Sequence, residues 1–193
     1  MKTEPINHKN IFYPPGGILL WIIIFLELIT FGMALIAMVI YSKDEPEVFH
    51  KSRLLLNTTF GAVNTFFLIT SGLFMAMSVH YLKLGNAKKS SLLLKLTMLG
   101  GFLFLVLKSV EYYEKIEAGL TISYNTFFSF YWMLTLFHVI HVLVGLVILM
   151  SVYVGLKKRG SNTIIEDFEA SAAFWHMCDL IWLLLFPIIY LIF

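Results

Sequence analysis

The stretch Phe174–Trp182, with the sequence FWHMCDLIW, places a histidine and an aspartate one helical turn apart inside an otherwise apolar segment. No charged residue follows from Leu180 to Phe193. A charged group at membrane depth costs at least a few kcal/mol unless it is paired, neutralised or turned inward. We therefore expect His176 and Asp179 to face other polar groups within a membrane-spanning helix rather than a soluble core.

The composition of the chain agrees with a membrane location. Of the 193 residues, 59% are hydrophobic, 16% are aromatic and only 13% are charged, which leaves too little polar surface to cover a soluble domain. The net charge of +2 is too small to indicate binding to nucleic acid. The single cysteine, Cys178, lies inside a predicted span, which excludes disulfides and thiolate metal clusters.

Five apolar segments are each near or above the length that a spanning helix requires, about 20 residues. We predict an all-α, polytopic membrane protein with a single membrane domain, residues 1–193, built as a bundle of five transmembrane helices. The helices are expected at residues 17–41, 58–82, 92–112, 126–156 and 169–193. The first is too long for the core of a cleaved signal peptide, so we expect it in the mature protein, preceded by a polar segment at residues 1–13.

The distribution of Lys and Arg predicts the orientation of the chain in the membrane. An odd number of spans places the two termini on opposite sides. Nine Lys and Arg residues fall on the side of the N-terminus and five on the other side. By the positive-inside rule, the N-terminus is cytoplasmic and the C-terminus is outside.

Glu27 is the one carboxyl group of the first predicted span. It lies ten residues after Gly17, roughly 15 Å at 1.5 Å per residue, which is close to mid-membrane. Ionising an unpaired carboxyl there would bury a charge, so we expect Glu27 to be protonated. Two roles fit this position: a hydrogen bond that supports helix packing, or a role in proton handling or lipid contact.

Three histidines lie well inside predicted spans, whereas His80 is near the end of the second span. His138 and His141 are three residues apart on the fourth span, and His176 is on the last. Two histidines at this spacing on one helix cannot be the opposite axial ligands of one haem, so we expect buried hydrogen bonds to carboxylates such as Asp179. The local sequence contains no zinc or copper motif, and we expect neither a metal nor another cofactor in this chain.

A charged stripe marks the outer end of the third span. Lys108, Glu111 and Lys115 share one helix face, and Glu114 lies beside them. This stripe is either an interfacial charge cluster that anchors the helix or a contact with a partner subunit.

An aromatic stripe runs along the last predicted span, and it includes Trp175 and Trp182. We group these tryptophans with the charged stripe as a candidate partner or interface cluster, although such stripes more often serve packing. Small residues predict close approach of the helices. They are Gly61, Ser71, Gly72, Gly100, Gly101 and Gly145, together with the pair Ser151 and Gly155.

Several short motifs occur along the chain in a fixed order. They are ELITFG at 27–32, NT at 64–65, TSG at 70–72, SVEYYE at 109–114, FHVIHVLVG at 137–145 and WHMCDLIWL at 175–183. Each motif alone is weak, but in this order and spacing they resemble subunit III of the haem-copper respiratory oxidases. The similarity spans almost the whole chain.

The resemblance implies roles for individual residues. Glu27 matches the family's membrane-buried glutamate, and the residues that match its other motifs are Glu111, Glu114, His138, His141, Gly145, His176, Asp179 and Trp182. It implies an accessory subunit without a catalytic centre, haem or copper of its own. Such a subunit flanks a catalytic subunit that carries haem and in some cases copper, holds phospholipid and supports proton uptake and sustained turnover.

The chain departs from the longer, seven-helix members of the family. It starts directly at the glutamate-bearing helix, so the lipid-filled cleft between a two-helix and a five-helix part cannot be present in the same form. The ending WLLLFPIIYL at 182–191 looks like the small proteins associated with bacterial nitric oxide reductases. Five-helix subunits of bacterial cytochrome c and quinol oxidases share most of the pattern.

We therefore predict a non-catalytic accessory subunit of a respiratory oxidase or a nitric oxide reductase in the bacterial cytoplasmic membrane. The alternative is an independent proton channel or transporter that uses Glu27, Asp179 and the intramembrane histidines. No inverted repeat or pair of broken helices, which many transporters have, is visible in the sequence.

Overall fold

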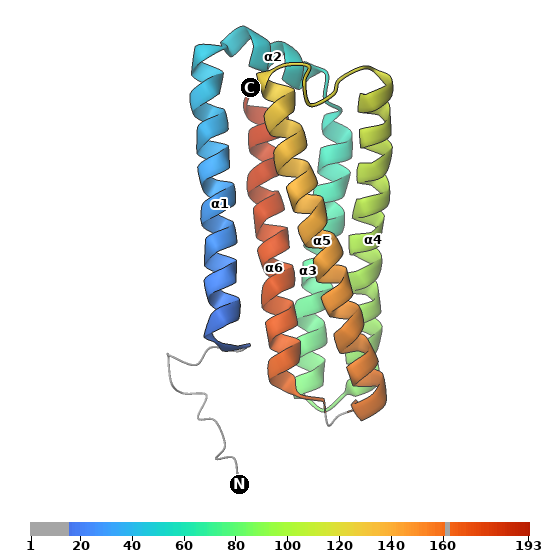
Figure 1. The fold of residues 1–193 in the computed structure, drawn as a ribbon. Coiled ribbons are helices and arrows are strands. Elements are labelled where there is room, and N and C mark those ends of the chain that lie inside the picture. The colour runs from blue at the N-terminus through green and yellow to red at the C-terminus, as the bar shows by residue number, and fades with distance from the viewer. Residues whose placement is uncertain (1–15, 161–162) are drawn as a thin grey trace.

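The computed structural model describes residues 16–160 and 163–193, so the predicted polar segment 1–13 lies outside it. The described chain is an all-α bundle, as predicted (Figure 1). Its helices are α1 (Gly17–Asp44), α2 (Pro46–Leu54), α3 (Thr58–Lys83), α4 (Ala87–Glu117), α5 (Thr126–Arg159) and α6 (Ile165–Pro187), followed by a π-helical turn, η2 (Ile188–Ile192). Five helices, all except α2, are long and apolar enough to cross a membrane.

Asparagine side chains fix where three of the spans begin. Asn57, Asn86 and Asn125 precede α3, α4 and α5, and each side chain accepts a hydrogen bond from a backbone N–H of the first turn. Asn86 explains why α4 begins before the predicted residue 92, because the polar residues after it are already helical. The same helix extends beyond residue 112 because part of its charged stripe is buried inside the bundle.

Helix α2 was not predicted, since its nine residues are too few and too polar for a span. It lies across one end of the bundle, next to the C-terminus of the chain (Figure 1). Phe49 points inward and packs edge-on against Phe127 and Phe193, with ring centroids 5.5 and 5.2 Å apart. Asn125 donates a hydrogen bond of 2.7 Å to the Ser52 hydroxyl. These contacts close the end of the bundle where α1 turns into α3.

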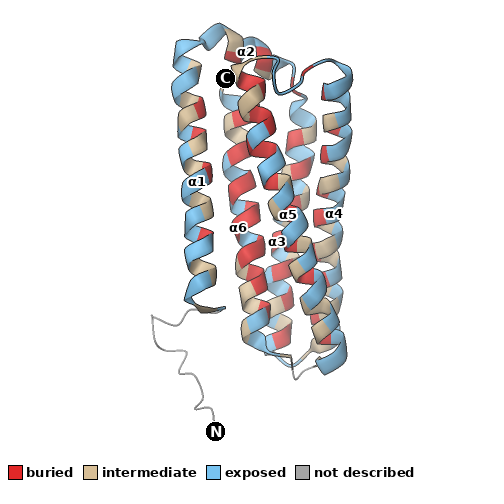
Figure 2. Ribbon diagram, in the orientation of Figure 1, coloured by how far each residue is buried: buried red, intermediate tan, exposed pale blue. Residues whose placement is uncertain are grey.

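Helix α6 is the central element of the bundle. In the most apolar stretch of the span Ile165–Ile192, half of the residues are buried within the chain, compared with 22% in the corresponding stretch of α1. It packs against α1, α3 and α5, and buried residues follow it along most of its length (Figure 2). Helix α1 lies at the edge, where it packs mainly against α5 and α6.

Trp175 of α6 is seated between two glycines on neighbouring helices. A Cβ atom at Gly101 of α4 would lie 2.5 Å from the indole ring, and one at Gly145 of α5 would lie 2.9 Å from it. The indole N–H donates a hydrogen bond of 3.1 Å to Ser71 of α3. One side chain therefore ties α6 to three helices, and the predicted close approach at these two glycines is confirmed. At Gly155 the prediction is wrong, because no heavy atom of the described chain lies within 4 Å of an added Cβ.

Adding a methyl group at one of the two glycines that contact Trp175, which we call glycine notches, is expected to destabilise the bundle. In Gly145→Ala the new methyl group meets an indole that Gly101 confines from the other side, so overpacking should lower the free energy of unfolding by about 1–3 kcal/mol. Thermal unfolding of the purified chain in detergent measures this loss. Gly155→Ala on the same helix is the matched control and should be neutral or slightly stabilising, because it adds a methyl group in open space. If Gly145→Ala is as stable as the wild-type chain, the close packing of Trp175 against Gly145 is contradicted.

Candidate functional site

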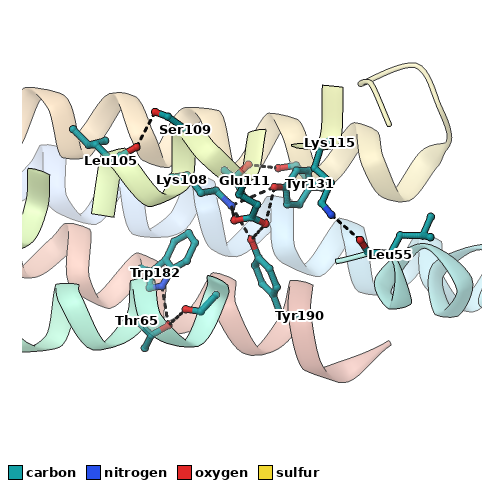
Figure 3. A network of polar contacts seen from close by, with 12 residues as sticks. Leu55, Thr65, Leu105, Lys108, Ser109, Glu111, Lys115, Tyr131, Trp182 and Tyr190 are labelled. Carbon is teal, nitrogen blue, oxygen red and sulfur yellow. Dashed lines mark hydrogen bonds and ion pairs between the residues drawn. The ribbon is translucent and has the colours of Figure 1, made fainter. Parts of the chain in front are cut away.

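A fully buried polar cluster joins Lys108 and Glu111 of α4 to tyrosines of α5 and η2 (Figure 3). Lys108 Nζ donates hydrogen bonds to Glu111 Oε2 at 3.0 Å, to the Tyr190 hydroxyl at 2.7 Å and to the Tyr131 hydroxyl at 3.3 Å. Both tyrosine hydroxyls donate to the second carboxylate oxygen, Glu111 Oε1, at 3.0 Å from Tyr131 and 2.6 Å from Tyr190. All four side chains are at most 1% exposed.

This cluster, which we call the lysine cluster (Lys108, Glu111, Tyr131 and Tyr190), is closed. An ammonium group has three donors, and all three of them are used within it. The ring of Trp182 lies over the ammonium, with its centroid 5.3 Å from Nζ. A buried ion pair is tolerated when its remaining hydrogen-bonding groups are satisfied, which is the case here. The cluster therefore joins α4, α5 and η2 and has no donor of the lysine to spare.

The predicted placement of the charged stripe in an interface needs correction. Lys108 lies nine residues before the end of α4, roughly 14 Å along its axis, and it is buried within this chain rather than at the membrane surface. Lys115 also turns inward and donates a hydrogen bond of 2.7 Å to the Leu55 carbonyl. Of the four charged residues of the stripe, Glu114 alone is exposed. Within the charged stripe, only Glu114 therefore has an exposed side chain that a partner could contact.

Trp175 and Trp182 also lie inside the bundle, both 0% exposed, so neither forms an exposed interface. The Trp182 indole N–H donates a hydrogen bond of 2.9 Å to the Thr65 hydroxyl of α3. Their size explains the difference from the predicted interface, because each large ring fills the space between α6 and its neighbours. Both tryptophans serve the packing that is more common for aromatic stripes.

Glu27 lies against His141 of α5, so a contact with a neighbouring helix, which one of its two expected roles requires, is present. Glu27 Oε2 lies 3.2 Å from His141 Nε2, within ion-pair distance but without the alignment of a hydrogen bond. The other ring nitrogen, Nδ1, is 2.7 Å from the Phe137 carbonyl, which can only accept, so Nδ1 carries a hydrogen. His141 Nε2 therefore carries a hydrogen only in the charged imidazolium.

The geometry of this Glu27–His141 pair restricts its proton content. If the pair carries no proton besides the Nδ1 hydrogen, the Glu27 carboxylate faces the lone pair of His141 Nε2. The span then contains an uncompensated negative charge. With one proton, the pair is either an ion pair or a neutral acid beside a neutral imidazole, and its net charge is zero. The side chains are 24% and 11% exposed, at the edge of the bundle. The pair can therefore hold one exchangeable proton at the surface of the subunit.

His138 contacts no carboxylate, so the expected hydrogen bond is absent. Neither ring nitrogen has a hydrogen-bond partner in the described chain. The imidazole is completely buried and packs between the rings of Phe104 and Trp182, with centroids 5.5 and 5.3 Å away. Aromatic residues from α4 and α6 occupy the space that a carboxylate would need.

His176 and Asp179 face each other on α6, as expected from their spacing, with Nδ1 and Oδ2 3.4 Å apart. The imidazole is 45% exposed, whereas the aspartate side chain is 10% exposed and lies against Gly72 of α3. No hydrogen bond or ion pair within the described chain joins this pair to Glu27 and His141. The two pairs therefore do not form the single relay that the channel alternative would use.

Residues 16–160 and 163–193 contain no group of three or more His, Cys, Asp or Glu residues placed to hold a metal ion. Tyr131 and Tyr190, which complete the lysine cluster, were not predicted as site residues. A lysine and a glutamate three residues apart in an apolar span were a usable signal, because they require further hydrogen-bonding groups on other helices.

Comparison with known proteins gives the family. The profile of the family described as "Cytochrome c oxidase subunit III" matches residues 51–192. The chain is 28% identical over 179 residues to the cytochrome bo(3) ubiquinol oxidase subunit 3 of Buchnera aphidicola, which covers 89% of this chain and 84% of that subunit. It is 36% identical over 129 residues to the cytochrome c oxidase subunit 3 of Loxodonta africana, which covers 66% of this chain and 48% of the relative.

The lengths of these relatives differ. The chain spans about half the length of the cytochrome c oxidase subunits it matches, including that of Squalus acanthias at 35% identity, and most of the ubiquinol oxidase subunit. The matched region, residues 51–192, contains α3 to α6 and every candidate site residue except Glu27. This chain belongs to the cytochrome c oxidase subunit III family.

Proposed function

We propose that this chain is a non-catalytic accessory membrane subunit of a respiratory haem-copper oxidase. The observation that carries the proposal is the family match over residues 51–192, supported by a relative of similar length that is a ubiquinol oxidase subunit. The partner is then a catalytic membrane subunit that carries haem, and the nitric oxide reductase complex stays a prediction from the ending at 182–191.

Purification separates these assignments. We expect the chain to copurify, in a gentle detergent, with a larger subunit whose haem absorbs in the Soret region. The chain freed from that subunit should have no Soret band. Oxygen consumption by the complex supports an oxidase, and consumption of nitric oxide alone supports the reductase. A haem spectrum that stays with the isolated chain and disappears in His138→Ala or His141→Ala would contradict the proposal.

The Glu27–His141 pair is our candidate for the functional site of the subunit. It lies near mid-membrane, holds one exchangeable proton and remains partly exposed, which the lysine cluster does not. A group that exchanges a proton at the edge of the subunit can support proton supply to the neighbouring catalytic subunit. The same position supports lipid contact, because an apolar cavity of about 260 Å³ between α1 and α5 begins at Thr30, three residues after Glu27.

That cavity is the proposed seat of a phospholipid acyl chain. Its lining is entirely apolar except for Thr30, and it includes Phe31, Met133 and Phe137. The Thr30 hydroxyl is already bonded to the Leu26 carbonyl, so the cavity offers no free donor. A hydrocarbon chain suits such a lining better than a polar ligand does. Mass spectrometry of the purified complex identifies the phospholipid.

Glu27→Gln tests the proton role. The amide can hydrogen-bond but cannot release a proton, so we expect an assembled complex whose sustained turnover falls, measured as oxygen consumed before activity is lost. A hydrophobic carbodiimide, which modifies protonated carboxyls, should label wild-type Glu27 and not Glu27→Gln. Labelling should persist in His141→Ala, because removing the imidazole favours the neutral acid. Glu114→Gln, at an exposed residue of α4, is the control. Wild-type turnover and lifetime in Glu27→Gln would leave only a packing role.

The orientation of the subunit is also proposed: N-terminus cytoplasmic and C-terminus outside, in the bacterial cytoplasmic membrane. The turn at 84–86, the end of α5 and the start of α6 lie at the end of the bundle where α1 begins (Figure 1). Lys157, Lys158 and Arg159 are at that end. At the opposite end, Lys115 is bonded to Leu55 within the chain, and Lys108 lies in the lysine cluster. At the first end, Lys83 is likewise paired with Glu169, so the proposed orientation rests on the count of Lys and Arg residues at each end.

Reporter fusions test this orientation. An alkaline phosphatase fused after Phe193 should be active, because it would be exported, and a fluorescent cytoplasmic reporter at the same position should be dark. The matched control is a fusion after Lys83, which should show the reverse pattern. An inactive phosphatase after Phe193 together with a bright cytoplasmic reporter would contradict the orientation.

A further inference from the structure

His176 is an exposed imidazole in the middle of a membrane span. It lies eleven residues after Ile165 and sixteen before Ile192 in the last span, roughly 16 and 24 Å from its ends. Its side chain is 45% exposed. Polar groups at this depth normally face the bundle interior, another protein or a water-filled cavity. The exposure of His176 therefore requires an explanation.

The hydrogen-bonding capacity of the pair is not used up within the chain. Nδ1 of His176 faces Asp179 Oδ2 at 3.4 Å, so Nε2 points away from the aspartate and has no partner in the described residues. Asp179 is 8% exposed, and its Oδ1 is buried without a hydrogen bond. Exposed hydroxyls elsewhere in the spans behave differently: Thr70, Ser109 and Ser151 each donate to the carbonyl four residues earlier in their own helix.

The pair is built into the contact between α6 and α3. A Cβ atom at Gly72 of α3 would collide with Asp179 Oδ2 and would lie 3.4 Å from His176 Nδ1. Only a glycine at this position lets the carboxylate sit behind the imidazole. Asp179 thus holds Nδ1 from one side, and this arrangement presents Nε2 outward.

Exposed apolar side chains occur beside His176 on α6 and beside Gly72 on α3. Leu180 and Leu183 of α6 follow His176 at four and seven residues, on the same helix face, and they are 47% and 45% exposed. Ile69 and Leu73 of α3 lie on either side of Gly72 and are 50% and 57% exposed. We call this surface the His176 strip. It is an apolar strip with one hydrogen-bonding nitrogen at its centre.

We propose that the His176 strip is the surface on which a membrane-spanning helix of the haem-carrying subunit docks, with a hydrogen-bonding side chain opposite Nε2. This inference rests on the proposed accessory function and adds the face through which it acts. Lipid acyl chains leave Nε2 without a partner at this depth, whereas a helix can supply one together with apolar contacts to the leucines. The strip is formed by α3 and α6, whereas the Glu27–His141 pair joins α1 and α5.

The first experiment compares three variants of the tagged chain in the intact complex, with the detergent concentration raised stepwise. The readout is the ratio of haem to chain that remains. We expect His176→Leu to weaken association about 3- to 30-fold, the range of intramembrane hydrogen bonds at about tenfold per 1.4 kcal/mol. His176→Gln, which keeps a hydrogen-bonding group, should retain most of the haem. Leu143→Ala, at a 48% exposed residue of α5, is the control and should match the wild type.

The second experiment does not depend on changing His176. A photo-crosslinking residue in place of Leu180, beside the imidazole, should form an adduct with the haem-carrying subunit in native membranes. Abundance and thermal unfolding of each variant show that the chain itself is folded.

The outcomes are distinct. If wild-type chain retains haem while His176→Leu retains it equally, or if position 180 crosslinks only to lipid or to a second copy of this chain, the His176 strip is not the docking surface and the accessory function stands. If the wild-type chain never associates with a haem-carrying subunit, the proposed function itself fails and the inference fails with it.

Discussion

The seating of α6 side chains in glycine notches on neighbouring helices is the constraint on which the bundle depends. Trp175 fits between Gly101 and Gly145, and the Asp179 carboxylate fits against Gly72. Lipid tails are as apolar as the helices, so burial of apolar surface gives no drive for association, and close packing and hydrogen bonds must supply it. A helix with large side chains on several faces needs neighbours with small residues at matching heights. This requirement places α6 at the centre.

The ion-paired groups of the spans are of two kinds, and the difference bears on function. The lysine cluster uses every donor of Lys108 and both carboxylate oxygens of Glu111, so it fixes the relative positions of α4, α5 and η2. The pairs Glu27–His141 and His176–Asp179 each keep an atom without an aligned hydrogen bond. In a medium of low dielectric constant an unmade hydrogen bond is expensive. Groups that carry this cost are therefore where we place proton exchange and partner contact.

These open pairs lie at comparable depth on different faces. Glu27 is ten residues into α1 and His176 is eleven residues into α6, and both helices begin at the same end of the bundle (Figure 1). The interior between them is filled by aromatic rings, including His138 packed against Phe104 and Trp182. The two partly exposed pairs are thus at the periphery of the subunit, where they can act on a neighbour, whereas the lysine cluster and His138 are buried inside it. This arrangement suits an accessory subunit better than an independent pathway across the membrane.

The sequence by itself determined the membrane class, the five spans and the motifs of the family. It could do so because span length and apolar composition follow directly from the thickness of the bilayer. It also indicated the His176–Asp179 contact, which depends only on the three-residue spacing within one helix. Close approach at the glycines followed from residue size, although Gly155 shows that a small residue permits such approach without requiring it.

Only the tertiary structure decided which polar groups meet across helices. The sequence predicts that the charged stripe is interfacial, because the stripe lies near the end of a span. In the structure, Lys108 is buried and donates hydrogen bonds to tyrosines of α5 and η2. The sequence did not name the partner of Glu27, because His141 is on α5, more than a hundred residues later. Helix α2 was not predicted from hydropathy, because it is short and polar and covers one end of the bundle instead of spanning the membrane. Contacts between distant segments depend on how helices rotate and pack, and local spacing carries no information about that.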